Sequence, residues 1–181
     1  MKPIIIIDLE ATCWEGAVPP GQQNEIIEIG ICLLDDNGIQ QSQGILIRPQ
    51  RSKISEFCTQ LTSITPEMVK DAPTFEEACE ILKKDYLTLE RRWGSWGDYD
   101  RKQFEQQSAS WNLPLPVSTE HINLKKLFAR LHRLPKPVGM AQALRIAQME
   151  LIGTHHRGGD DAYNIARLVQ HMRETFGAEV I

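Results

Sequence analysis

Four consecutive isoleucines, Ile4 to Ile7, constrain the fold more than any other feature of this chain. An unbroken run of β-branched residues is typical of a central strand whose two faces are both covered. Such a strand points alternate side chains to the same face, so we expect Asp8 and Glu10 to project together. Two neighbouring carboxylates repel each other unless a proton or a cation lies between them. The segment therefore predicts either a site for a hard divalent ion such as Mg²⁺ or Mn²⁺, or two solvated acids at a strand end.

The rest of the pattern predicts an α/β protein that forms one domain over residues 1–181. After the first strand we expect four more, at residues 26–34, 44–48, 92–97 and 121–123. An Asn-Gly turn at residues 35–38 is typical of a hairpin between the second and third strands. Helices are expected at residues 73–87, 101–110, 124–131, 138–149 and 160–176. This order indicates a mixed five-stranded sheet with helices on both faces.

The composition is that of an ordinary globular protein, with 41% hydrophobic and 24% charged residues. No apolar run reaches membrane-spanning length, and the first one is too short for a signal peptide. We therefore expect a cytoplasmic protein with no membrane partner. The four cysteines are widely spaced, which favours reduced thiols over a disulfide framework or a zinc site.

The net charge of −4 does not indicate a nucleic-acid-binding protein, but the charge is unevenly distributed. Residues 125–136 contain no acid and carry five cations, Lys125, Lys126, Arg130, Arg133 and Lys136. Such a segment is either a solvated helix face or a track for phosphate groups.

A second group of polar residues lies in the loop at residues 153–161, which contains two histidines, two adjacent glycines and two acids. We expect Asp160 to cap the last helix, which would place Asp161 in the first turn of that helix. His156 precedes Asp161 by five positions.

A fourth acid is expected where the chain leaves an aromatic strand and enters a helix. Asp98 and Asp100 are both candidates, and either could merely cap the helix. Asp100 is favoured because it directly follows the aromatic Tyr99 at the helix entrance, while Asp98 stays an alternative.

Three or four converging carboxylates without thiolates fit a two-metal site, with the ions roughly 3.5–4 Å apart. Such ions lower the pKa of a bound water and stabilise the leaving oxygen of a displacement at phosphorus. An imidazole, with its ordinary pKa of about 6.5, can take the proton from that water. The pattern therefore predicts hydrolysis of a phosphodiester.

The same residues resemble the DEDDh signature of DnaQ-like 3′–5′ exonucleases, within the ribonuclease H-like superfamily. The signature residues are Asp8 and Glu10, then Asp100, then the pair His156 and Asp161. The chain is more narrowly similar to the Eri-like branch in five segments that follow the same order, at residues 8–13, 25–30, 61–65, 156–161 and 161–167. The resemblance runs from Pro3 to about Met172 and implies a ribonuclease H-like fold.

The resemblance also implies the roles of particular residues. Four acids would hold two Mg²⁺ or Mn²⁺ ions, namely Asp8, Glu10, Asp100 and Asp161, and His156 would be the general base. Substrate contacts to the 3′-terminal nucleotide are implied for Ala11, Thr12, Leu61, Ile64 and Tyr99. Of these, Leu61 and Ile64 would form an apolar wedge against the terminal base, and Tyr99 would stack on a sugar or base.

Two positions depart from the pattern of the family. Ser63 stands where a glycine is common, which would change details of the terminal-base pocket. Gly159 replaces a common apolar residue, and we expect a more flexible His156 loop as a result.

We therefore expect a metal-dependent 3′–5′ exonuclease that acts on single-stranded ends, with RNA favoured over DNA. The alternatives are a DNA exonuclease, a phosphodiesterase for very short oligonucleotides, and a non-catalytic nucleic-acid-binding module on the same fold. The presence of all five catalytic residues argues against the non-catalytic module.

Overall fold

The computed structural model describes residues 3–181, and its centre is a sheet with the strand order β3-β2-β1-β4-β5. The strands are β1 (Ile4–Ala11), β2 (Ile26–Asp35), β3 (Gly38–Leu46), β4 (Trp93–Ser95) and β5 (His121–Asn123). Strands β1, β2 and β3 pair antiparallel, whereas β4 runs parallel to β1 and β5 runs parallel to β4. The expected mixed five-stranded sheet is confirmed.

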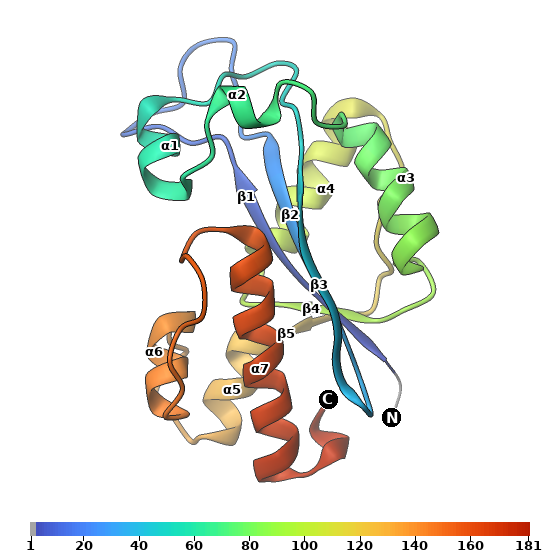
Figure 1. Cartoon of the computed structure of the whole chain (residues 1–181), viewed down its shortest axis with the longest axis vertical. Helices are drawn as coiled ribbons and strands as arrows, with labels where there is room; N and C mark the ends of the chain where they lie inside the picture. Colours follow the sequence, from blue (N-terminus) through green and yellow to red (C-terminus); the bar gives the residue numbers. More distant parts are fainter. Residues whose placement is uncertain (1–2) are drawn as a thin grey trace.

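Helices cover both faces of this sheet (Figure 1). One face is covered by α5 (Leu124–Leu131), α6 (Met140–Ile146) and α7 (Gly158–Phe176). The other face is covered by α3 (Phe75–Tyr86) and α4 (Tyr99–Trp111). The short helices α1 (Glu56–Thr62) and α2 (Pro66–Val69) lie together beyond one end of the sheet, and a 3₁₀ turn, η1 (Ala178–Val180), follows α7. None of the helices described over residues 3–181 combines the length and the apolar character needed to cross a membrane.

The isoleucines of β1 divide between the two cores, as their alternation predicts. Ile4 and Ile6 pack with α5, α6 and α7, while Ile5 and Ile7 pack with α3 and α4. All four side chains are fully buried. Because the alternation continues along the strand, β1 turns its next two even-numbered residues, both acids, to the α7 face.

The start of α7 touches the sheet through glycines. A Cβ atom on Gly30 of β2 would lie 1.7 Å from the carbonyl oxygen of Gly158, and one on Gly159 would lie 2.7 Å from the amide nitrogen of Gly44 in β3. Only residues without side chains allow this backbone approach. Gly159 therefore serves close packing, which is a different role from the loop flexibility expected from the sequence.

Several boundaries differ from those expected. Strand β3 begins six residues earlier, at Gly38, because its polar residues 40–43 form the exposed edge of the sheet and give no apolar signal. Helix α7 begins at Gly158, so Asp160 does not cap it; its carboxylate instead accepts a hydrogen bond from the amide of Thr154 (2.7 Å).

The helical stretches show further differences. Helix α6 is confined to residues 140–146, and α4 begins at Tyr99, two residues before the expected start. The short helices α1 and α2 were not expected from the sequence. Each is too brief to show a clear apolar periodicity, and each begins after a Ser or Thr cap, a residue type that is equally common in turns.

Candidate active site

A cavity of about 390 Å³ lies where the end of β1 meets residues of α1, α4, α6 and the loop before α7. Its lining includes all five residues expected to be catalytic. The lining residues are Asp8, Leu9, Glu10, Ala11, Cys13, Leu61, Trp96, Tyr99, Asp100, Gly139, Met140, His155, His156 and Asp161.

Three carboxylates form the centre of this cavity. Oxygen atoms of Asp8, Glu10 and Asp161 lie within 4.8 Å of one another. Burial raises the pKa of Glu10 to about 8, and the negative charges of Asp161, Glu28 and Asp100 add to this effect. Burial and the same kind of repulsion also raise the pKa of Asp8 well above its usual range. The cluster therefore carries charge that a proton or a cation must balance.

Asp100 reaches the cluster from the first turn of α4. Its Oδ1 accepts a hydrogen bond from the amide of Leu9 in β1 (2.9 Å), which ties α4 to the strand that carries the other acids. Burial raises the pKa of Asp100 to about 6, against the lowering effect of the hydrogen bonds from Leu9 and Ser95.

Asp98, the alternative to Asp100, points elsewhere. Its Oδ2 lies 3.2 Å from the Nζ of Lys126 on α5, and it is not part of the cavity lining. The structure thus brings Asp100 into the cavity and leaves Asp98 outside it. The described lining also contains none of the cations of residues 125–136, so their role as a phosphate track stays a prediction.

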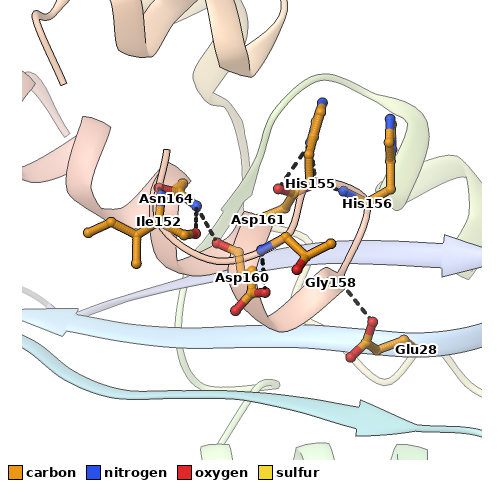
Figure 2. Close-up of polar contacts among 9 residues, drawn as sticks. Glu28, Ile152, His155, His156, Gly158, Asp160, Asp161 and Asn164 are labelled. Atoms are coloured by element: carbon orange, nitrogen blue, oxygen red, sulfur yellow. Dashed lines mark hydrogen bonds and ion pairs between the residues drawn. The ribbon is translucent and has the colours of Figure 1, made fainter. Parts of the chain in front are cut away.

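Two histidines flank Asp161 at the start of α7 (Figure 2). The amide of His156 donates a hydrogen bond to Asp161 Oδ2 (2.9 Å), and Nδ1 of His155 lies 2.9 Å from the same oxygen. The two imidazole rings stack with their centroids 4.0 Å apart. His156 has a left-handed backbone with φ of 64°, which turns the chain sharply before the helix. Burial and the neighbouring His155 lower the pKa of His156, so its imidazole is neutral and able to accept a proton.

The structure divides the expected substrate residues into two groups. Ala11, Leu61 and Tyr99 line the cavity, and Leu61 and Tyr99 are 41% and 54% exposed. Thr12 and Ile64 are fully buried and lie outside the lining.

The structure therefore does not expose the side chains of these two residues at the cavity. The hydroxyl of Thr12 donates to the carbonyl of Gln23 and accepts from the amide of Glu25, so its single donor is already used within the protein. Ile64 packs in the small core beneath α1 and α2, with Cys58 and Val69, and its side chain is not exposed. A family motif shows which segments approach a site, but not which side chains of a segment are exposed.

Three further residues of the site, His155, Trp96 and Glu28, were not predicted from the sequence. His155 could have been suspected because it adjoins His156, and Trp96 because it ends the aromatic strand. Trp96 lines the cavity and donates a hydrogen bond from Nε1 to the carbonyl of Val138 (3.0 Å), which holds the segment before α6. The sequence around Glu28 does not indicate a functional role, since Glu28 is a single acid within an apolar strand. It is buried next to the cluster and accepts hydrogen bonds from Arg157 and Gly158.

The donor set fits a hard divalent cation. The acids offer only oxygen ligands, and their raised pKa values reflect an excess of negative charge that such an ion would relieve. Cys13 also lines the cavity, but burial raises the pKa of its thiol to about 12, so it stays protonated and is a poor ligand. The residues present are therefore able to bind a metal ion through carboxylates.

Comparison with known proteins is consistent with this site. The family model RNase_T, described as an exonuclease, matches residues 5–169. The chain is 31% identical over 185 residues to human 3′-5′ exoribonuclease 1, covering 93% of this chain and 52% of that protein. It is 26% identical over 205 residues to the 3′-5′ exonuclease eri1 of Schizosaccharomyces pombe, covering 95% of this chain and 68% of that protein. The chain thus spans about half the length of its human relative.

Solved structures show the same fold. The nuclease domain of 3′hExo, a DEDDh family member bound to rAMP, superposes with a TM-score of 0.83 at 30% identity, covering 97% of this chain and 93% of that one. A second structure shows a 3′-exonuclease in 3′-end specific recognition of a histone mRNA stem-loop. It superposes with a TM-score of 0.82 at 29% identity, covering 97% of this chain and 65% of that one. These matches confirm the expected ribonuclease H-like fold.

Proposed function

Since the chain belongs to the RNase_T exonuclease family, we propose that it hydrolyses phosphodiester bonds at the 3′ end of single-stranded RNA. The convergence of four carboxylates and one neutral histidine in a single cavity supports this proposal most directly. These residues come from β1, α4, the loop before α7 and the first turn of α7. Buried acids with strongly raised pKa values are typical of functional sites.

In this proposal Asp8, Glu10, Asp100 and Asp161 would hold two Mg²⁺ or Mn²⁺ ions. When bound, the ions would supply an acidified water and stabilise the leaving oxygen at phosphorus. His156 would accept a proton from the attacking water, since its lowered pKa keeps the imidazole neutral and a neutral imidazole has one unprotonated ring nitrogen. Asp161 fixes the backbone of His156 by accepting a hydrogen bond from its amide, so one carboxylate would contribute both to the metal site and to the orientation of the base.

We propose that the terminal nucleotide contacts Leu61 of α1 and Tyr99 of α4, the two exposed apolar side chains of the lining. An aromatic ring offers a stacking surface that accepts any base. The preference for RNA rests on the related proteins, which are named as exoribonucleases or described in complex with rAMP and with recognition of an mRNA stem-loop.

The decisive experiment uses the purified chain with single-stranded RNA and DNA of matched sequence, labelled at the 5′ end. With Mg²⁺ or Mn²⁺ we expect stepwise shortening from the 3′ end, faster on RNA, and none with a chelator. Equal or faster degradation of DNA would favour the DNA exonuclease instead. Activity confined to dinucleotides would favour the phosphodiesterase for short oligonucleotides, and binding without cleavage would favour the non-catalytic module.

The variant His156→Ala tests the assignment of the base. We expect turnover to fall by about 10²–10⁴-fold with Mn²⁺ affinity retained, because the side chain transfers a proton and does not hold the metal. His171→Ala is the matched control, since this histidine lies on α7 outside the cavity. A near-normal rate for His156→Ala would exclude its role as general base.

We also propose that residues 1–181 act as one exonuclease domain in the cytoplasm, as expected from the sequence. Activity of this chain without other proteins would support the first statement. Cell fractionation with an antibody against the chain would test the second, and recovery of the protein outside the cytoplasmic fraction would contradict it.

A further inference from the structure

Glu28 is a buried acid with three hydrogen bonds to the segment that carries His156. It lies in β2, and its side chain is 2% exposed. Glu28 Oε1 accepts from Nη2 of Arg157 (3.1 Å), and Oε2 accepts from Nε of Arg157 (3.2 Å) and from the amide of Gly158 (2.8 Å). The guanidinium is thus held by two parallel bonds, the geometry in which an Arg–carboxylate pair is strongest and most specific in direction.

The location of this pair connects it to the candidate active site. Glu28 lies directly opposite Glu10 in the ladder between β1 and β2, and opposite residues of an antiparallel pair project to the same face. Arg157 directly follows His156, and Gly158 is the first residue of α7. One carboxylate on the sheet therefore holds the two residues that come next after the candidate base (Figure 2 shows the contact with Gly158).

We propose that Glu28 and Arg157 are positioning residues, a buried pair that fixes the His156 segment relative to the metal-binding acids. The inference rests on the proposed exonuclease function. Neither side chain lines the cavity, so both would act through the segment that they hold. Arg157 also offsets the negative charge of Glu28, which would otherwise add to the crowded acids beside it.

The pair predicts an asymmetry between two single variants. Arg157→Ala leaves a buried carboxylate with one backbone partner, whereas Glu28→Gln leaves a guanidinium that is 28% exposed and can turn to water. We expect Arg157→Ala to lower kcat by about 10- to 100-fold, as is usual for residues that orient the ligands of a metal site. Glu28→Gln should lower it less, and Glu28→Gln combined with Arg157→Ala should recover part of the loss. KM should stay unchanged, since Leu61 and Tyr99 lie on other helices.

Glu25→Gln is the matched control, because Glu25 is equally buried and precedes the same strand. Its carboxylate accepts from the backbone amides of Gln50 and Arg51, away from the His156 segment. We expect Glu25→Gln to lower the melting temperature without lowering kcat below that temperature. Arg157→Lys, which keeps the charge, should restore part of kcat. An unchanged kcat in Arg157→Ala, or an equal loss in Glu25→Gln, would show that the pair has only a structural role.

Amide hydrogen exchange, followed by mass spectrometry, separates this inference from the proposed function. In Arg157→Ala the amides of residues 155–158 should exchange faster, while Glu25→Gln should leave them protected. Failure of the unaltered chain to shorten RNA would overturn the proposed function, and the exchange rates would still decide whether the pair anchors the segment. Unchanged exchange in Arg157→Ala would overturn the anchoring.

Discussion

Replacement of Glu10 by glutamine should stabilise the metal-free protein, and this gain should grow with pH. The unfolded side chain loses its proton near pH 4.5, whereas burial and the neighbouring acids raise the pKa of folded Glu10 to about 8. Between these two values the folded protein binds a proton that the unfolded chain has lost, so its stability falls as the pH rises. Glutamine mimics the protonated acid and removes this dependence.

The size of the effect follows from the same two values. Each unit of difference in pKa corresponds to about 1.4 kcal/mol, so complete ionisation of Glu10 costs the folded protein on the order of 5 kcal/mol. For a domain of this size, 1 kcal/mol shifts the melting temperature by roughly 2–4 °C. Glu10→Gln should therefore melt roughly 10–20 °C above the unaltered protein at pH 8, and within a few degrees of it at pH 5.

Thermal unfolding in the presence of a chelator, at several values between pH 5 and pH 8, measures this difference directly. Added Mn²⁺ should raise the melting temperature of the unaltered protein more than that of Glu10→Gln, because the ion balances the ionised acid. If the gap between the two proteins is the same at pH 5 and pH 8, repulsion in the acid cluster is not the cause and the reasoning fails.

Three other changes test separate features of the structure. Ser63 caps the C-terminus of α1 with a left-handed φ of 62°, a conformation that glycine adopts without strain. Ser63→Gly should therefore raise the free energy of unfolding, measured by urea titration, by roughly 1 kcal/mol. An unchanged free energy of unfolding would mean that Ser63 is not strained. Gly159→Ala should lower the free energy of unfolding by about 1–3 kcal/mol and reduce kcat, because the new Cβ would lie 2.7 Å from the amide nitrogen of Gly44. An unchanged free energy of unfolding together with an unchanged kcat would refute the close packing of α7 against β3. Arg130→Gln should reduce the slope of log KM against log salt concentration by about 0.7 if the basic segment contacts one phosphate of a single strand, and an unchanged slope would leave Arg130 as a solvated surface residue.

The elements that could be predicted from the sequence are those with a strong local pattern. The isoleucine run and the two acids after it determine both the central strand and the face that carries the metal-binding candidates. Likewise, Leu124, Leu127 and Phe128 form the apolar stripe of α5, whose bounds agree with those expected. In both cases the period of the buried residues is complete within one element, so no contact from elsewhere is needed to recognise it.

What could not be predicted depends on contacts between distant parts of the chain. The role of Glu28 depends on its contact with Arg157, which lies 129 positions later in the sequence, so the sequence around Glu28 does not indicate it. The burial of Thr12 and Ile64 depends on how the end of β1 and the segment after α1 pack, which a motif does not encode. Gly159 has a role only because β3 lies within reach of its Cα.

The candidate active site can form only late in the synthesis of the chain, because it joins residues that are far apart in the sequence. The contact between Leu9 and Asp100 joins positions 91 residues apart, and the contact between Glu28 and Arg157 joins positions 129 residues apart. At about 5–20 residues per second, a ribosome needs roughly 6–26 s to pass from Glu28 to Arg157. Throughout that interval β1 and β2 have no α7 to cover them, and the acids of β1 have no His156 beside them. For the proposed ribonuclease, the candidate site can therefore be complete only after the residues that begin α7 have been synthesised.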